Sequence, residues 1–269
     1  MHLYKTTQGI VLRRANAFQF LDSDWDQLIS NDGLCRFLSG QITNGCDRAK
    51  HAVENHLMAP IGSQEIWACG VTYYNSQMAR REESEAAGGG DFYSRVYHAE
   101  RPEIFFKSTA NRAAGHGQNV RIRSDSTWDV PEPELTLVVS PTGKILGYTI
   151  GNDMSSRSIE GENPLYLPQA KNYEQSAGIG PGIFVTDEPI SPNTEIRLEI
   201  FRNESPVFAG TTHIASITRK LDDLVSWLYR ELHFPVGAYV MTGTGIVPTS
   251  EFTLQPGDRI EIEIDGIGK

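Results

Sequence analysis

Residues 131–153 read PEPELTLVVSPTGKILGYTIGND. Two apolar runs, rich in β-branched residues, flank the segment 141–144, whose proline and glycine are typical of a turn. The pattern predicts an antiparallel hairpin with strands over 134–140 and 145–150. A two-residue turn at Thr142-Gly143 would place Pro141 opposite Lys144.

Three carboxylates come together in this predicted hairpin. Glu132 and Glu134 are two residues apart, so an extended chain projects both side chains from one face. The same pairing, continued along both strands, places Asp153 opposite Glu132, and a longer turn would shift Asp153 by only one or two positions. Carboxylates this close repel one another unless a cation or a shared proton lies between them. The hairpin therefore predicts a site for Mg²⁺, with Mn²⁺ or Ca²⁺ as alternatives.

Composition excludes several classes of protein. The 269 residues are 39% hydrophobic and 22% charged, which is typical of a globular chain, and they suit one large domain or a domain with a small appendage. With 24 Lys and Arg against 34 Asp and Glu, the net charge is −10, so neither nucleic acid nor a membrane surface is expected as a partner. The three cysteines have no metal-ligand spacing, and no apolar run suggests a signal peptide or a span. A cytoplasmic protein is expected.

The remaining patterns predict an α+β chain that is mostly β. Alternating or apolar runs predict further strands at 10–12, 66–71, 104–106, 120–123, 195–201 and 259–264. Apolar residues at helical spacing predict a helix over 217–232, and Ser23-Asp24 is a candidate cap for a short helix. A turn-rich break suggests a small N-terminal α/β domain over 1–65 and a catalytic domain over 66–269. Three glycines at 88–90 suggest a flexible lid.

Several segments resemble the fumarylacetoacetate hydrolase family. The resemblance spans 66–269 and is carried by PEPEL (131–135), GYTIGNDMSSR (147–157), Lys171 ahead of GIGP (178–181), TGTG (242–245) and LQPGDRIEIEI (254–264). It implies a mostly β roll that assembles as a homodimer or homotetramer. It also implies a divalent metal on Glu132, Glu134 and Asp153. Lys171 matches the family's active-site lysine, and Thr244 matches the threonine at the carboxylate end of the substrate.

One departure from the family's hydrolases concerns their water-activating pair. Those enzymes carry a histidine six residues after the glycine that here is Gly70, and a glutamate three residues further on. Ser76 and Ala79 occupy these positions, and neither side chain can act as that base. The usual hydrolytic route is therefore not expected.

A finer pattern is similar to the branch of 2-keto-3-deoxy-D-arabinonate dehydratases. It is carried by Tyr73, VYHAERPEIFFK (96–107) and SIEGENPLYLPQAK (158–171). The resemblance implies that Glu103 lies in the active site with Lys171, and that Tyr73, Phe106 and Lys107 bind substrate. Lys171 is expected to act as a base or an electrostatic stabiliser, and Glu103 as the complementary acid or base. Arg157 is expected to pair with Asp153 or a neighbouring loop.

The function expected from these residues is dehydration of a small 2-oxo acid. The leading hypothesis is a divalent-metal-dependent dehydratase of a 2-keto-3-deoxy sugar acid, acting through a metal-stabilised enolate. A second hypothesis is a hydrolase or decarboxylase of a β-diketo acid, which uses a water held by Glu82, Glu83 or another lid group. A third, from another class, is a non-catalytic protein that binds a metal and an oxo acid.

Overall fold

One large sheet organises the computed structural model, which describes residues 1–41, 45–74 and 95–269. Its strands are β1 (His2–Thr6), β2 (Gly9–Arg14), β3 (Ala17–Leu21), β4 (Glu65–Gly70), β5 (Glu103–Thr109), β6 (Ala113–Ala114), β8 (Pro133–Val139), β9 (Ile145–Asp153), β11 (Ala177–Val185) and β14 (Ala238–Met241). Their order across the sheet is β3-β2-β1-β11-β9-β8-β14-β4-β5, with β6 paired to β11 outside this path. The mostly β fold is confirmed.

The predicted hairpin is formed by β8 and β9 in the middle of this sheet. Its predicted turn is wrong: Ser140, not Pro141, pairs with Lys144, and the turn holds three residues with Gly143 at φ 85°. A β-bulge between the Val138 and Val139 pairs then inserts one extra residue into β9. The longer turn and the bulge cancel, so Asp153 does lie opposite Glu132, as the sequence predicts.

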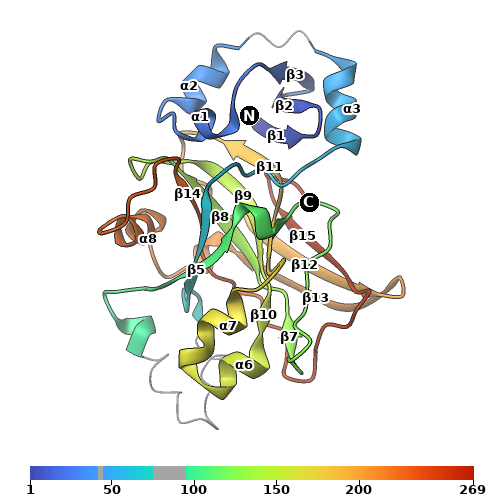
Figure 1. Cartoon of the computed structure of the whole chain (residues 1–269), viewed down its shortest axis with the longest axis vertical. Helices are drawn as coiled ribbons and strands as arrows, with labels where there is room; N and C mark the ends of the chain where they lie inside the picture. Colours follow the sequence, from blue (N-terminus) through green and yellow to red (C-terminus); the bar gives the residue numbers. More distant parts are fainter. Residues whose placement is uncertain (42–44, 75–94) are drawn as a thin grey trace.

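The N-terminal residues lie at one end of the molecule (Figure 1) and continue the large sheet. Strand β1 pairs antiparallel with β11, and the helices α1 (Trp25–Ile29), α2 (Leu34–Ser39) and α3 (Asp47–Asn55) follow β3. Asp24 caps α1 as expected, because its carboxylate accepts a hydrogen bond from Gln27 N at 3.1 Å. Leu3 and Trp25 share one buried cluster with Ala68 and Tyr239, so the hydrophobic core continues across residue 65. A domain boundary near that residue stays a prediction.

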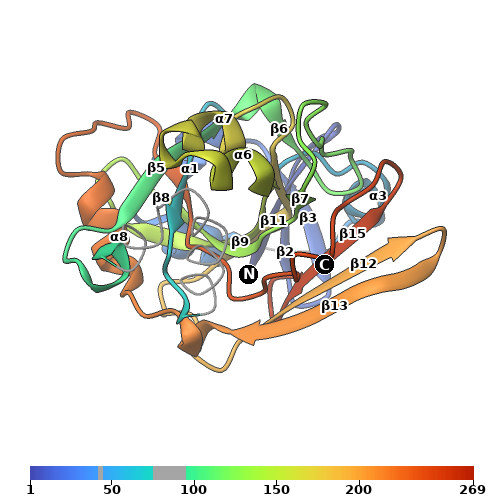
Figure 2. The same ribbon diagram turned by 90° about the horizontal axis from the view of Figure 1, so that it is seen from below.

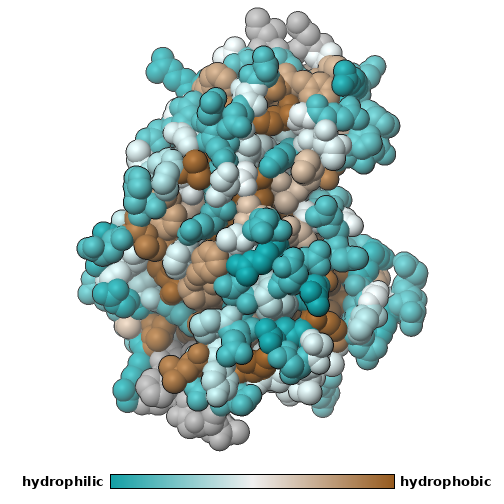
Figure 3. Space-filling model, in the orientation of Figure 1, coloured by the Kyte–Doolittle hydropathy of each residue, from teal (hydrophilic) through white to brown (hydrophobic). Residues whose placement is uncertain are grey.

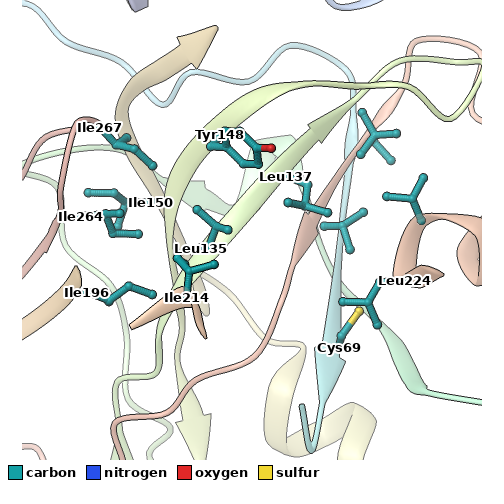
Figure 4. Close-up of a cluster of buried hydrophobic side chains, with 14 of the residues drawn as sticks. Cys69, Leu135, Leu137, Tyr148, Ile150, Ile196, Ile214, Leu224, Ile264 and Ile267 are labelled. Carbon is teal, nitrogen blue, oxygen red and sulfur yellow. The ribbon is translucent and has the colours of Figure 1, made fainter. Parts of the chain in front are cut away.

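A second layer packs against one face of β8 and β9. It consists of a three-stranded sheet, β13 (Ser205–His213), β12 (Glu195–Arg202) and β15 (Arg259–Ile264), the 3₁₀ turn η4 (Ile214–Ser216) and helix α8 (Leu221–Leu228). Figure 4 shows the hydrophobic cluster between the layers. Leu135, Leu137 and Ile150 of the hairpin meet Ile196 and Ile264 there.

The other face of the hairpin packs near its turn on α1 and α2, and short elements lie on that side toward the opposite end. They are the 3₁₀ turns η2 (Ala110–Arg112) and η3 (Pro164–Tyr166), the paired strands β7 (Asp129–Val130) and β10 (Ser155–Ser156), and helices α6 (Arg157–Glu162) and α7 (Leu167–Lys171). Figure 2 shows α6 and α7 across β8 and β9 from the β12–β13 hairpin. Ser156 Oγ accepts from Ile159 N at 3.3 Å and caps α6, which fixes the direction in which the chain leaves β10.

Two predicted elements differ from the structure. Residues 120–123 are irregular, and Arg121 N bonds to Gln175 O at 3.1 Å instead of a strand partner. The helix predicted over 217–232 is limited to α8, because Ile217 is extended and forms a β-bridge with Tyr73. The strands predicted at 10–12, 66–71, 104–106, 195–201 and 259–264 correspond to β2, β4, β5, β12 and β15. Strands β2 and β5 extend two and three residues beyond the predicted ends, and the other bounds agree within one residue.

The surface is mainly hydrophilic on the face shown in Figure 3, with hydrophobic residues interspersed. Among the described residues, no helix has both the length and the apolar character that crossing a membrane requires.

Candidate metal centre and active site

The three predicted metal ligands lie together at the end of the hairpin opposite its turn. Glu132, Glu134 and Asp153 are buried, and each offers one carboxylate oxygen within 4.8 Å of the others. Asp153 N donates to Glu132 O at 2.9 Å, which extends the ladder one residue beyond β8. The predicted convergence of these side chains is confirmed.

Lys171, the last residue of α7, reaches into this triad. Its Nζ donates to Glu132 Oε2 at 2.6 Å, to Asp153 Oδ2 at 3.1 Å and to Ser155 Oγ at 2.6 Å. The side chain is fully buried, so its three donors depend on these three acceptors. The structure thus places the predicted active-site lysine directly beside two of the three candidate metal ligands.

Two further cations neutralise the triad from behind. Lys107 Nζ lies 2.5 Å from Asp153 Oδ1 and donates to the carbonyl oxygens of Met154, at 2.8 Å, and of Lys171. Complete burial lowers the pKa of Lys107, while Asp153 opposes that change. Arg157 Nη2 binds Glu132 Oε1 at 2.6 Å. Arg157 therefore binds Glu132, a neighbour of the expected partner Asp153 in the triad. Lys107 binds Asp153 and two backbone carbonyl oxygens and is not among the residues that line the cavity, and its role as a substrate ligand stays a prediction.

Glu134 is the carboxylate of the triad without such a cation. Its Oε2 accepts a hydrogen bond from Gly243 N at 2.6 Å, and within the described part of the chain no lysine or arginine pairs with it. Burial, with repulsion from Asp153 and Glu132, raises the pKa of Glu134 well above its usual range. Three buried carboxylates, one of them uncompensated, are a donor set that suits a hard divalent cation.

A small cavity opens on the triad and Lys171. Its wall includes Gly70, Val71, Phe105, Gly243 and Thr244. Thr244, which is expected at the carboxylate end of the substrate, thus lines the same cavity as the triad. The combination of a concave apolar wall with convergent charged groups is typical of a small-molecule site.

The turn that forms part of this wall is strained. Val71 has φ 54°, a left-handed conformation that is costly for a β-branched residue. The next residue is held firmly: Thr72 O accepts from Thr218 N at 2.9 Å and from Thr218 Oγ1 at 2.8 Å, and Thr72 Oγ1 donates to Thr242 O at 2.6 Å. These bonds stabilise the strained turn beside the cavity.

The predicted aromatic substrate ligands are placed less directly. Phe106 lies on the face of β5 that points away from the cavity, and it packs edge-on against Trp67 with ring centroids 5.6 Å apart. Phe105 lines the cavity instead, and Lys171 Nζ lies 5.8 Å from its ring centroid. Tyr73 is buried with its ring against Gly245. Burial, with a smaller contribution from the charge of Glu134, raises the pKa of the Tyr73 hydroxyl.

Glu103 lies at the start of β5, directly opposite Gly70 of β4. Its Oε2 is buried and has no hydrogen-bond partner among the described residues. Its carboxylate lies over Gly70, which lines the cavity. Glu103 thus stands at the cavity edge with an unpaired oxygen, whereas the predicted lid around Gly88–Gly90, the glutamates Glu82 and Glu83, and Ser76 and Ala79 lie outside the described residues.

Comparison with known proteins decides the family. A model of the fumarylacetoacetate hydrolase C-terminal domain matches residues 72–269. The chain belongs to the fumarylacetoacetate hydrolase family. The matched part carries the triad, Lys171 and Glu103, whereas β1–β3 and α1–α3 precede it.

Two relatives within this family are similar over most of their length. A probable 2-keto-3-deoxyxylonate dehydratase of Haloferax volcanii is 45% identical over 233 residues, which cover 86% of this chain and 79% of the relative. The 2-dehydro-3-deoxy-D-arabinonate dehydratase of Saccharolobus solfataricus is 43% identical over 211 residues, which cover 78% and 71%. A solved structure of a 2-keto-3-deoxy-D-arabinonate dehydratase, complexed with magnesium and 2,5-dioxopentanoate, superposes with a TM-score of 0.82 at 33% identity, covering 99% of this chain and 95% of that one.

Proposed function

We propose that this family member is a divalent-metal-dependent dehydratase of a 2-keto-3-deoxy sugar acid, with 2-keto-3-deoxy-D-arabinonate as the reference substrate. The observation that carries the proposal is the buried triad of Glu132, Glu134 and Asp153 with Lys171 on one cavity. Two relatives at 43–45% identity bear the names of such dehydratases, which supports the substrate class.

We assign the metal to the three carboxylates and take Mg²⁺ as the physiological ion. The similar structure complexed with magnesium supports this choice over Mn²⁺ and Ca²⁺, which favour the same oxygen ligands. A bound divalent cation would polarise the 2-oxo group and stabilise the negative charge that develops when a C3 proton leaves. Lys107 and Arg157 bind one oxygen each of Asp153 and Glu132, and Lys171 binds the other oxygen of both, so these two carboxylates are oriented in advance.

Lys171 is the group that acts at C3 of the substrate. In its neutral form the amine accepts the C3 proton, and in its ammonium form it stabilises the charge that develops beside it. Burial and three fixed acceptors hold its Nζ within 3.1 Å of Glu132, Asp153 and Ser155. Either role depends on this placement, and the isotope experiment described in the Discussion distinguishes the two.

Glu103 is the group that acts at C4. Loss of water breaks the C4–O bond, so the departing hydroxyl needs a proton, which a protonated carboxyl supplies. Loss of water leaves a C3=C4 double bond conjugated to the 2-oxo group. Protons then leave C5 and its hydroxyl while protons from solvent add at C3 and C4, which gives the 2,5-dioxo acid. Thr244 lies in the cavity wall and its hydroxyl is suited to the substrate carboxylate, while Phe105 supplies apolar contact in place of Phe106. Tyr73, beside Gly245, and Lys107, paired with Asp153, pack around the metal ligands.

Homo-oligomerisation and a cytoplasmic location complete the proposal. Leu165 is 83% exposed and Tyr166 37% exposed, in the turn that leads into α7. Exposed apolar side chains of this kind are typical of subunit interfaces, and a homodimer or homotetramer would cover them. The cysteines Cys35, Cys46 and Cys69 are free thiols, as a reducing compartment favours. Light scattering at micromolar concentration should give the mass of two or four chains; the mass of one chain would contradict the assembly.

The activity is tested by product identification. The purified protein with Mg²⁺ is incubated with 2-keto-3-deoxy pentonates in one set of reactions and with acylpyruvates in another. The products of both sets are identified by mass. Loss of one water from a deoxy sugar acid, abolished by EDTA, is the expected result. Cleavage fragments from an acylpyruvate would indicate hydrolysis, loss of carbon dioxide would indicate decarboxylation, and no turnover would leave a binding protein.

A further inference from the structure

Gly70 and Glu103 form a directly opposed pair at the ends of β4 and β5. Opposed residues of an antiparallel pair project their side chains from the same face, about 5 Å apart at Cβ. At this pair the Glu103 side chain also fills the space that a side chain at position 70 would occupy. A Cβ added to Gly70 would lie 1.9 Å from Glu103 Oε2 and 2.6 Å from Cδ, so the carboxylate lies across the place where any other residue would have its side chain.

Backbone conformation does not explain this glycine. The positive-φ glycines of the described chain do not include Gly70, so its dihedral angles are open to other residues. The adjacent pair on the same face, Ala68 and Phe105, carries a Cβ on both strands. The ladder therefore tolerates side chains at this separation, and what requires glycine at position 70 is the Glu103 carboxylate.

Packing on Gly70 also fixes the Glu103 carboxylate where hydrogen bonds do not. Its Oε2 is buried and has no hydrogen-bond partner among the described residues. A buried carboxylate oxygen without a donor is costly, and a donor from a bound substrate would relieve that cost. Gly70 lines the cavity with Lys171 and Phe105, so the carboxylate that rests on it is held at the cavity edge.

We propose that Gly70 is a positioning residue for the dehydration step: by lacking a side chain, it seats the Glu103 carboxylate at the cavity edge, where it meets the departing C4 hydroxyl. The inference rests on the proposed function and adds the residue that sets the position of the general acid. An alanine at position 70 must push Oε2 from 1.9 Å to the 3.4 Å of ordinary contact, a shift of about 1.5 Å. Misplacement of a catalytic group by ~1 Å can cost about 10²-fold in rate.

Gly70→Ala is therefore expected to lower kcat by about 10²-fold. It should leave Mg²⁺ affinity unchanged, because the candidate ligands are Glu132, Glu134 and Asp153, whereas the atoms nearest to a Cβ at position 70 belong to Glu103. It should also leave exchange of the C3 protons with deuterated water intact. Gly178→Ala is the matched control: this glycine of β11 in the same sheet would place its Cβ 3.2 Å from Asn152 Cβ, and it does not touch Glu103. The control should keep kcat within about twofold.

A double-mutant cycle separates positioning from general damage to the sheet. In a Glu103→Gln background, Gly70→Ala should cause no further loss of kcat, because there is no acid left to displace. Multiplied losses, or a Gly70→Ala protein with kcat within twofold of the parent, would overturn the inference. Full dehydration by Glu103→Gln alone would instead overturn the proposed role of Glu103.

A stability measurement keeps the inference testable if Gly70→Ala folds poorly. Glu103→Ala removes the carboxylate that occupies the space above Gly70. The thermal midpoint of Gly70→Ala/Glu103→Ala should then equal that of Glu103→Ala, whereas Gly70→Ala alone should unfold at a lower temperature. An equal loss of midpoint on adding Gly70→Ala to both backgrounds would show that the glycine serves the strand and not the acid.

Discussion

The same substitution, glutamate to glutamine, should have opposite effects on stability at two of the metal ligands. Glu132 binds Lys171 and Arg157 at 2.6 Å each, so its charge is compensated twice. Glu134 accepts one backbone hydrogen bond, and burial with repulsion from its neighbours raises its pKa well above the usual range. A carboxyl whose pKa rises on folding lowers stability at neutral pH.

The magnitudes follow from these contacts. Breaking a buried ion pair by removing one partner costs about 3–5 kcal/mol, so Glu132→Gln should destabilise the metal-free protein by roughly 3 kcal/mol. Glu134→Gln removes a buried, uncompensated charge and keeps an oxygen acceptor for Gly243 N, so it should stabilise the metal-free protein by ~1–3 kcal/mol. Both variants should lose Mg²⁺ binding, since each removes one anionic ligand.

Urea unfolding in EDTA and in excess Mg²⁺ tests this contrast. In EDTA, the midpoint of Glu134→Gln should lie above that of the parent and the midpoint of Glu132→Gln below it. In Mg²⁺ at ~100 times Kd the parent should gain about 2.7 kcal/mol, and neither variant should gain. Equal destabilisation by both variants in EDTA would refute the assignment of Glu134 as the uncompensated charge, and an unchanged Mg²⁺ response in both would remove the metal site.

Three other changes address the remaining parts of the site. Glu103→Gln should lower kcat by ~10²–10⁴-fold with a modest change in KM, measured by steady-state kinetics; an unchanged kcat would contradict its role. Lys171→Met should be at least as damaging, and a protein that still turns over normally would remove Lys171 from the mechanism. Burial raises the pKa of the Cys69 thiol whereas Cys46 is exposed, so iodoacetamide should label Cys46 in the native protein and Cys69 only in denaturant; peptide mapping that finds native labelling of Cys69 would contradict its burial.

The triad could be predicted from the sequence because its geometry is local. Spacing of two residues places Glu132 and Glu134 on one face, and a short hairpin carries Asp153 back to them. The prediction held although the turn was longer than expected. The bulge in β9 restored the register, since a one-residue slip of β9 would have turned Tyr148 and Ile150 away from the core that they share with Ile196.

Other features depend on contacts that spacing does not reveal. Ile104-Phe105-Phe106 is a continuous apolar run without alternation, so the sequence could not show that Phe105 faces the cavity and Phe106 faces Trp67. The roles of Lys107 and Arg157 depend on pairings across 46 and 25 residues, to Asp153 and Glu132. The dependence of Glu103 on Gly70 required the register of β4 and β5, which residues 71–102 separate in the sequence.

The shortening of the helix predicted over 217–232 has a similar cause. Its apolar spacing is real, but Ile217 is extended and forms a β-bridge with Tyr73, and Thr218 donates to the carbonyl oxygen of Thr72 instead of starting a helix. Tertiary contacts thus override helical periodicity at this end. Arg219, the next residue, donates to the carbonyl oxygens of Val96, Ala99 and Glu100, so the same short segment supports the approach to β5 and Glu103.

The most direct test of the central claim follows 2-keto-3-deoxy-D-arabinonate by proton NMR in deuterated water with Mg²⁺. The parent protein should convert it to 2,5-dioxopentanoate with solvent deuterium at C3, and EDTA should stop the reaction. Glu103→Gln should still exchange the C3 protons without forming product, and Lys171→Met should do neither if the amine is the base; exchange that persists in Lys171→Met and vanishes in Glu103→Gln would reverse the two roles. Formation of the dioxo acid at an undiminished rate in EDTA, or no reaction of this substrate with Mg²⁺ present, would contradict the account.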